Sequence, residues 1–343
     1  MTLPLSSWVS QARGIRRAAA GGVSLLVATM LLPLRGETVE ETFETDPFTR
    51  GWRLLGEGTP AVWDADSGRL RFEWDSSKPN AFFARPLGVE LRRNNDFEFG
   101  FDLELTAHAV GTTASKPGTF PIAVGLIRMQ EAVEGTFLRG TGASTPDLVE
   151  WAWFGADASI SASISPVMTS TNRPPRWAFR DSYVELTTGH VYRVEARYTA
   201  MDSTLRFTVR VDGEPGPEIR PVVLPSTFTD FRVDAISFTS YSDAGQDPRY
   251  AGSVKATAWV DSVRWVMPDV PRPPLQLMAM TDPKQLQCPT QVGWVYQLEA
   301  STDMLSWGPV DVPVAGTGGT VMFTDLREAL FLNQFYRVKV VRE

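Results

Sequence analysis

The chain has 343 residues, of which 43% are hydrophobic, and its 33 basic and 40 acidic side chains give a net charge of −7. Nucleic acid and anionic membrane surfaces both demand clustered Lys and Arg, so this acidic balance argues against either as a partner. The single cysteine, Cys288, cannot form a disulfide within one chain. Stability must therefore come from apolar burial, for which this length suffices, and Cys288 itself is expected to be a small buried side chain.

The first 36 residues contain four arginines and no acid, and they include an uncharged, mostly apolar run over residues 18–34. A basic start followed by an apolar run predicts a secretory signal peptide over residues 1–36. The alternative is an uncleaved membrane anchor, but a span needs about 20 apolar residues, and Gly21, Gly22 and Pro33 interrupt this one. We therefore expect a secreted, periplasmic or cell-envelope protein with no membrane insertion after cleavage.

Alternating apolar and polar residues predict strands along the next part of the chain. The alternating segments are 70–75, 97–105, 149–153, 192–198, 206–211 and 236–240. No segment after residue 36 has a convincing helical period. Strands with one apolar and one polar face are typical of antiparallel sheets stacked as a sandwich. Residues 37–268 are predicted to form this large domain.

A proline-rich segment follows the predicted large domain. Residues 269–274 contain three prolines, which predicts an extended and fairly stiff linker. Residues 275–343 then form a second module, in which segments 295–300 and 335–340 alternate as strands do. The sequence thus predicts two β domains joined by a linker.

Several short motifs resemble a concanavalin A-like lectin/glucanase, or laminin G-like, domain. The motifs are Phe43…Asp46-Pro47…Gly51-Trp52, Trp63…Gly68-Arg69-Leu70 and Trp259-Val260-Asp261-Ser262-Val263. The resemblance covers about residues 41–268 and implies a jelly roll, with segments 43–52 and 259–265 as its first and last strands. The second module resembles a small β-sandwich found at the C-termini of many exported bacterial proteins, on Tyr296–Asp303, Trp307, Phe323–Asp325 and Phe335–Val338. The expected fold class is all-β: an antiparallel jelly-roll β-sandwich plus a second, smaller β-sandwich module.

Aromatic and acidic side chains are the candidates for carbohydrate binding, because sugars stack their C–H faces on rings and hydrogen-bond to carboxylates. The candidates are Trp151, Trp153, Trp177, Tyr241, Asp102 and Glu104. Trp151 and Trp153 lie on the apolar phase of their strand, so core packing is the alternative for both.

Catalytic carboxylates are not evident. Glycoside hydrolysis uses two carboxylates that flank the scissile bond. Glu98, Asp102 and Glu104 share one strand face, but their spacing differs from the Glu-x-Asp-x-x-Glu pattern of laminarinase-like enzymes. A solvated strand face is the alternative for these residues and for Glu150. We therefore expect no catalytic residue.

A structural calcium ion is implied by the resemblance, because related jelly rolls often bind Ca²⁺ between their first and last strands. Glu44, Asp46 and Asp261 would supply carboxylate ligands there. The alternative is that Asp46 initiates a turn and Asp261 faces solvent. His108 and His190 are isolated in the sequence, which argues against a zinc site or a Ser-His-Asp triad.

The sequence favours an exported, non-catalytic protein that binds carbohydrate or another surface polymer, with a polysaccharide or cell-surface glycan as its partner. One alternative is a glycoside hydrolase or related sugar-cleaving enzyme on the same fold. A third is a structural envelope or adhesion protein without a small ligand.

Overall fold

A computed structural model describes residues 37–134, 147–170, 176–246, 251–268, 273, 275–279, 284–304, 306–327 and 334–342. The predicted signal peptide and most of the predicted linker lie outside the described residues. Within the described part of the chain, no helix is long and apolar enough to cross a membrane.

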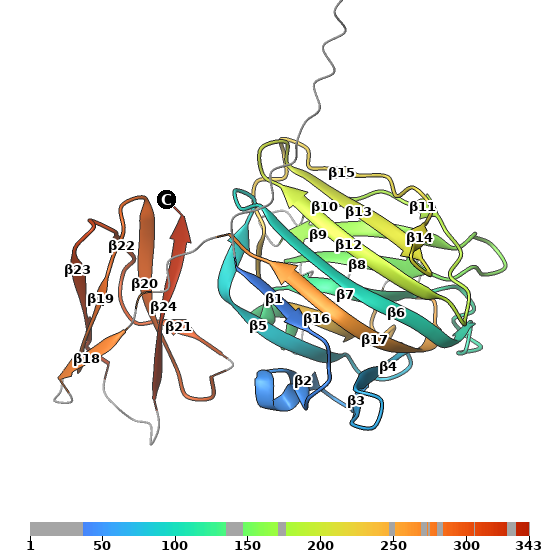
Figure 1. Cartoon of the computed structure of the whole chain (residues 1–343), viewed down its shortest axis with the longest axis horizontal. Coiled ribbons are helices and arrows are strands. Elements are labelled where there is room, and N and C mark those ends of the chain that lie inside the picture. Colours follow the sequence, from blue (N-terminus) through green and yellow to red (C-terminus); the bar gives the residue numbers. More distant parts are fainter. Residues whose placement is uncertain are drawn as a thin grey trace, which may run out of the picture. The chain divides into compact units, whose positions relative to one another are not determined.

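Two antiparallel sheets face each other in the large domain (Figure 1). Sheet A has the order β14-β13-β12-β6-β17-β4-β3, with β1 added on β17 and β15 on β13. Its strands are β1 (Thr38–Glu41), β3 (Ala61–Asp64), β4 (Arg69–Asp75), β6 (Phe97–Val110), β12 (Val191–Thr199), β13 (Thr204–Val211), β14 (Glu214–Pro215), β15 (Val222–Val223) and β17 (Val254–Val266).

Sheet B has the order β10-β9-β8-β7-β16-β5-β2, with β11 added on β9. Its strands are β2 (Arg53–Gly56), β5 (Ala81–Arg92), β7 (Pro121–Ile127), β8 (Leu148–Phe154), β9 (Ser163–Ser170), β10 (Arg176–Phe179), β11 (Ser182–Tyr183) and β16 (Arg232–Ser240). A four-residue helix, α1 (Met129–Ala132), follows β7. The predicted all-β sandwich is thus what the chain forms.

The core between the two sheets is built from the apolar phase of each strand. Phe97, Phe99 and Phe101 on β6 are at most 2% exposed. Phe101 meets Trp151 of sheet B edge-to-face, with ring centroids 5.5 Å apart. Such edge contacts add about 0.5–1.5 kcal/mol beyond the area that they bury. The alternation that predicted these strands therefore marks the residues that join the sheets.

The first strand is not the one that the resemblance implied. Residues 43–52 hold the 3-10 helix η1 (Pro47–Arg50), because Asp46 caps it by accepting a hydrogen bond from the Phe48 amide at 2.9 Å. The preceding residues form β1, which pairs with β17 so that Val39 lies opposite Trp265. The prediction of a strand over 43–52 was wrong, because Pro47 lacks an amide donor and the Asp-Pro pair favours a turn.

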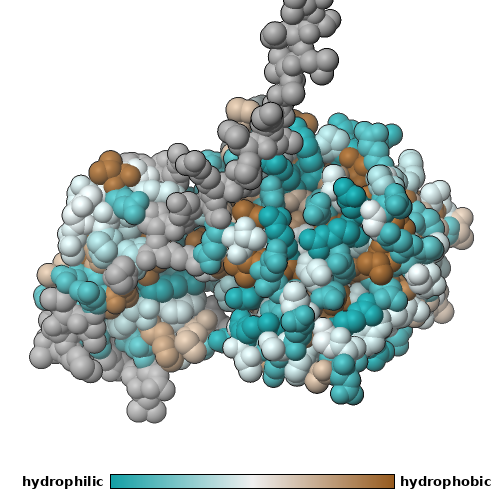
Figure 2. Space-filling view, in the orientation of Figure 1, coloured by the Kyte–Doolittle hydropathy of each residue, from teal (hydrophilic) through white to brown (hydrophobic). Residues whose placement is uncertain are grey.

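The outer face of sheet A is a solvated, charged surface, as its polar phase predicted. Arginines and acids from different strands pair across it. Arg197 lies 3.6 Å from Glu98 and Arg193 lies 3.2 Å from Asp102, both between β12 and β6, and Arg69 on β4 reaches across β17 to within 2.5 Å of Glu104. The surface over these strands is mostly hydrophilic in Figure 2.

The C-terminal residues form two further small sheets with their own apolar cluster. One contains β18 (Gln276–Ala279), β19 (Lys284–Pro289) and β23 (Thr320–Asp325); the other contains β20 (Trp294–Ser301), β21 (Gly308–Pro309), β22 (Val314–Ala315) and β24 (Phe335–Arg342). Cys288 is fully buried in that cluster beside Tyr296 and Phe323, which confirms the expectation of a buried thiol. The resemblance of this module to accessory domains stays a prediction.

Candidate functional site

The outer side of sheet B differs from that of sheet A because it is largely buried. All seven residues of β7 are buried, and so are six of the seven residues of β8. Trp151 points into the core toward Phe101, so its neighbour Glu150 points to the outer side. Register places Glu150 between Gly125 on β7 and Val167 on β9.

Glu150 is paired with a phenol on this outer side. The Tyr241 hydroxyl donates a hydrogen bond of 2.6 Å to Glu150 Oε1, and the two residues are 0% and 1% exposed. Gly125 makes room for them, since a Cβ there would lie 3.0 Å from Glu150 Cγ and 2.3 Å from the Val149 oxygen. The expectation that Glu150 stands on a solvated face was therefore wrong: sheet B is covered on both sides at its centre.

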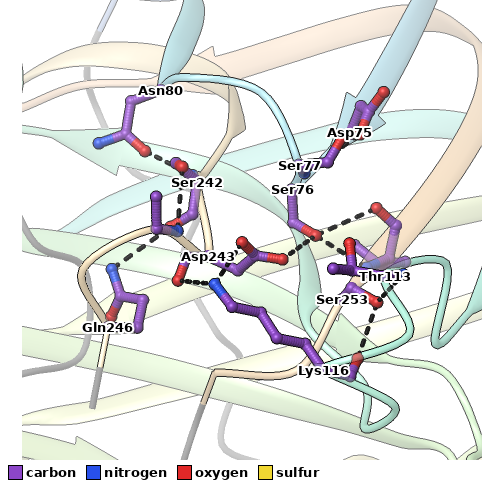
Figure 3. A network of polar contacts seen from close by, with 12 residues as sticks. Asp75, Ser76, Ser77, Asn80, Thr113, Lys116, Ser242, Asp243, Gln246 and Ser253 are labelled. Atoms are coloured by element: carbon purple, nitrogen blue, oxygen red, sulfur yellow. Dashed lines mark hydrogen bonds and ion pairs between the residues drawn. The ribbon is translucent and has the colours of Figure 1, made fainter. Parts of the chain in front are cut away.

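A polar network holds the segment that follows Tyr241 (Figure 3). Lys116 Nζ donates to Asp243 Oδ1 and to the Asp243 carbonyl, both at 2.8 Å. Ser76 Oγ donates to Asp243 Oδ2 at 3.2 Å, and the Asp243 amide donates to the Ser76 carbonyl at 2.8 Å. Because Asp243 is two residues beyond Tyr241, these bonds fix the chain that carries the phenol. The Glu150–Tyr241 pair is thus a rigid buried contact, with neither group open to a ligand.

Three exposed rings line the edge of the same side of sheet B. Trp177 and Phe179 on β10 are 55% and 52% exposed, and Tyr183 on β11 is 77% exposed. They lie opposite Thr169, Val167 and Ser163, which are alternate residues of β9, so all three rings lie on one side. We call Trp177, Phe179 and Tyr183 the aromatic strip.

The aromatic strip is unusual within the described residues. Elsewhere among their exposed large apolar side chains, Phe48 is the one other aromatic ring. Trp177 and Phe179 are two residues apart on one strand, a separation of about 7 Å. Two exposed rings therefore lie next to each other along the edge strand.

The six predicted carbohydrate-binding residues do not gather at one site. Trp151 and Trp153 are fully buried, and Trp153 Nε1 donates to the Val184 carbonyl at 3.0 Å, so the core alternative holds for both. Tyr241 is buried against Glu150. Asp102 and Glu104 lie on the outer face of the opposite sheet. Trp177 alone is exposed where a ligand could stack on it.

Sequence reasoning missed Phe179 and Tyr183. The Trp-x-Phe spacing of residues 177–179 is a two-residue period that could have placed both rings on one face. Tyr183 carried no such signal, because its position depends on how β11 pairs with β9.

The three predicted calcium ligands do not form a metal site in the described part of the chain, although Glu44 and Asp261 are close enough for their charges to interact. The structure, over its described residues, holds no group of three His, Cys, Asp or Glu side chains placed to hold a metal ion. The Asp46 carboxylate is used to cap η1. Asp261 accepts a hydrogen bond of 2.6 Å from the Ser262 amide, and burial raises its pKa, as do the charges of Asp102 and Glu44. Calcium binding therefore stays a prediction.

Comparison with known proteins adds little beyond the architecture. No protein-family model matches the chain, and no curated protein matches it. Similar solved structures include the alginate lyase Aly36B (11% identity, TM-score 0.40, covering 68% of this chain and 97% of that one). They also include a legume lectin-like domain from Entamoeba histolytica, with 12% identity and a TM-score of 0.40, covering 66% of this chain and 95% of that one. A third is lectin II from Ulex europaeus, with 10% identity and a TM-score of 0.39, covering 68% of this chain and 98% of that one. Likenesses this distant say nothing about which ligand this chain binds.

Proposed function

We propose that this protein binds a polysaccharide or another surface polymer without cleaving it, and that the aromatic strip is its binding platform. The observation that carries the proposal is the exposure of Trp177, Phe179 and Tyr183 on one side of β10 and β11. Exposed apolar rings are costly in water and mark interaction sites. Aromatic rings offer a large apolar face at low conformational cost, which suits the C–H faces of sugars.

Binding without cleavage is supported by the carboxylates near the strip. Hydrolysis of a glycosidic bond needs two carboxyl groups about 5–9.5 Å apart with the bond between them. Glu150 is the one carboxylate on strands β7, β8 and β9, and it is buried against Tyr241. Asp181, between β10 and β11, accepts a hydrogen bond from Ser165 Oγ. Because Glu150 is closed off from any ligand, it cannot act with Asp181 as the pair that hydrolysis requires.

The location of binding is part of the proposal. The basic and apolar N-terminal segment favours export, which would bring the aromatic strip to glycans of the cell envelope or its surroundings. An acidic protein is compatible with neutral sugars, because they carry no charge to repel.

A glycan array tests the proposal directly. The purified protein should bind one class of glycan, and Trp177→Ala and Phe179→Ala should each weaken binding by tenfold or more, equivalent to about 1.4 kcal/mol. Met201→Ala is the matched control, since Met201 is 93% exposed and lies outside the strip. A blank array, or equal binding by the strip variants and the control, would favour the structural or adhesion role. Release of new reducing ends from a bound glycan would overturn the non-catalytic assignment.

A further inference from the structure

A second candidate site lies on the outer face of sheet A, away from the aromatic strip. A pocket of about 460 Å³ crosses this face where strands β13, β12, β6, β17 and β1 lie near one another. Its polar lining includes Arg193, Arg210, Arg264, Asp102 and Glu40. Neither the sugar-stacking rings nor the buried Glu150 contributes to it.

A strained bulge in β17 shapes the floor of this pocket. Asp261 lies opposite Asp102 on β6, but Arg264 lies opposite Gly100, so the register shifts between them. Ser262, inside the bulge, has a φ of +49°. A left-handed conformation at a non-glycine residue costs about 1–3 kcal/mol and is found where the surrounding structure requires it. Bulges of this kind re-aim groups next to functional sites.

The group that the bulge presents is the Ser262 carbonyl, and it holds an arginine. Arg193 Nη1 donates to the Ser262 oxygen at 2.8 Å and to Asp102 Oδ1 at 3.2 Å. The Arg193 side chain is 24% exposed. A guanidinium has five N–H donors in a fixed plane, so these two bonds from Nη1, with Glu195 Oε1 3.7 Å from Nε, orient it. Arg193 is therefore held in place before any ligand arrives.

The charges around the pocket are mixed. The lining carries three arginines (Arg193, Arg210 and Arg264) and two carboxylates (Asp102 and Glu40). Arg264 lies 3.8 Å from Glu40, and Arg193 lies 3.2 Å from Asp102. An ion of either sign would therefore meet like charges in the lining. Vicinal hydroxyls of a neutral sugar both donate and accept hydrogen bonds, so they can pair with the arginines and the carboxylates together.

We propose that the pocket at the β17 bulge is a binding site for a neutral sugar unit, with Arg193 as donor and Asp102 as acceptor. The site lies on the opposite sheet from the aromatic strip and stands independently of it. Arg193 and Asp102 would recognise the hydroxyl pairs of a single sugar unit, whereas the aromatic strip would recognise the apolar face of a polysaccharide.

The experiment compares variants on an array of neutral mono- and oligosaccharides and by calorimetric titration with glucose, galactose and mannose. Arg193→Ala and the isosteric Asp102→Asn should each weaken binding of at least one neutral sugar by tenfold or more. Arg206→Ala is the matched control, because Arg206 faces outward from β13 and pairs with Asp202 outside the pocket. Thermal unfolding identifies any variant that fails to fold, and Asp102→Asn keeps the shape of the side chain if Arg193→Ala does not fold.

The outcomes separate this proposal from the one above. Sugar binding that survives Trp177→Ala but is lost in Asp102→Asn supports the pocket alone. Binding lost in Trp177→Ala and unchanged in both pocket variants supports the strip and overturns the pocket. Titration with sodium sulfate and glucuronate is the last arm: Arg193-dependent binding of these anions, with no neutral sugar bound, would also overturn the proposal.

Discussion

Glu41 is a buried carboxylate whose removal should loosen the closure of the sandwich. It ends β1 at 1% exposure, where Oε1 accepts from the Phe43 amide at 2.9 Å and Oε2 accepts from Trp52 Nε1 at 2.9 Å. It also pairs with Arg50, and Arg85 lies 3.9 Å away. One carboxylate thus joins β1, the turn that contains η1, and β5.

Glu41→Ala would leave the Phe43 amide and Trp52 Nε1 without their acceptor, whereas the partly exposed Arg50 keeps its bond to the Thr45 carbonyl. A buried donor left without an acceptor costs about 1–3 kcal/mol, so the two together cost about 2–6 kcal/mol. For a domain of about 150–250 residues, 1 kcal/mol lowers the melting temperature by about 2–4 °C. The expected fall is therefore about 4–24 °C. Glu41→Gln keeps one acceptor oxygen and the shape of the side chain, so we expect a smaller loss.

The neighbouring residue provides the control. Glu40 is on the same strand, but its side chain is 68% exposed and lies 3.8 Å from Arg264. Exposed ion pairs contribute about 0–1 kcal/mol, so Glu40→Ala should change little. Urea unfolding followed by tryptophan fluorescence measures the free energy of unfolding for both variants. Equal losses in Glu40→Ala and Glu41→Ala, or a loss under about 1 kcal/mol in the latter, would refute the reasoning.

Three further predictions concern other parts of the chain. Burial lowers the pKa of His108 in the folded protein. As the pH drops below about 6.5, the His108 imidazole is therefore protonated in the unfolded chain before it is protonated in the folded one, and the free energy of unfolding should fall. His108→Leu should reduce that fall, as measured by urea titrations at about pH 7 and pH 5. Gly155→Ala would place a Cβ 2.2 Å from His108 Cε1 and should cost about 1–3 kcal/mol in the same assay, whereas Gly308→Ala, with nothing within 4 Å, should be nearly neutral. If calcium bridges the chain ends, EDTA should lower the melting temperature and Asp261→Ala should abolish that effect; a melting curve that EDTA leaves unchanged would contradict the calcium prediction.

Periodicity within a strand predicted six strands of the sandwich, β4, β6, β8, β12, β13 and β16. It missed strands such as β7, whose residues are buried on both sides and do not alternate. Residues 97–105 alternate, and their apolar phase is the row of β6 side chains in the core. The same rule placed Asp102 and Glu104 on the solvated face of sheet A. Local turn chemistry was equally informative at Asp46-Pro47, where the family resemblance implied a strand and the residues themselves indicated a turn.

The sites depended on contacts that no local pattern contains. Alternation predicted that Glu150 points away from Trp151, but not that its side of sheet B is buried as well. The aromatic strip exists because β10 and β11 both pair with β9 in one register. The pocket on sheet A exists because β17 bulges beside β6.

Where the sequence alternates, it determined by itself that the residues form a strand and which side chains share a face, because a strand repeats every two residues whatever surrounds it. Only the tertiary structure decided which of those faces meets water and which distant residues stand together on it. Trp151 and Trp177 show the difference: both are tryptophans on strands of sheet B, yet one packs against Phe101 in the core and the other is exposed at the edge. Burial is set by segments far away along the chain, and so it is absent from any local pattern.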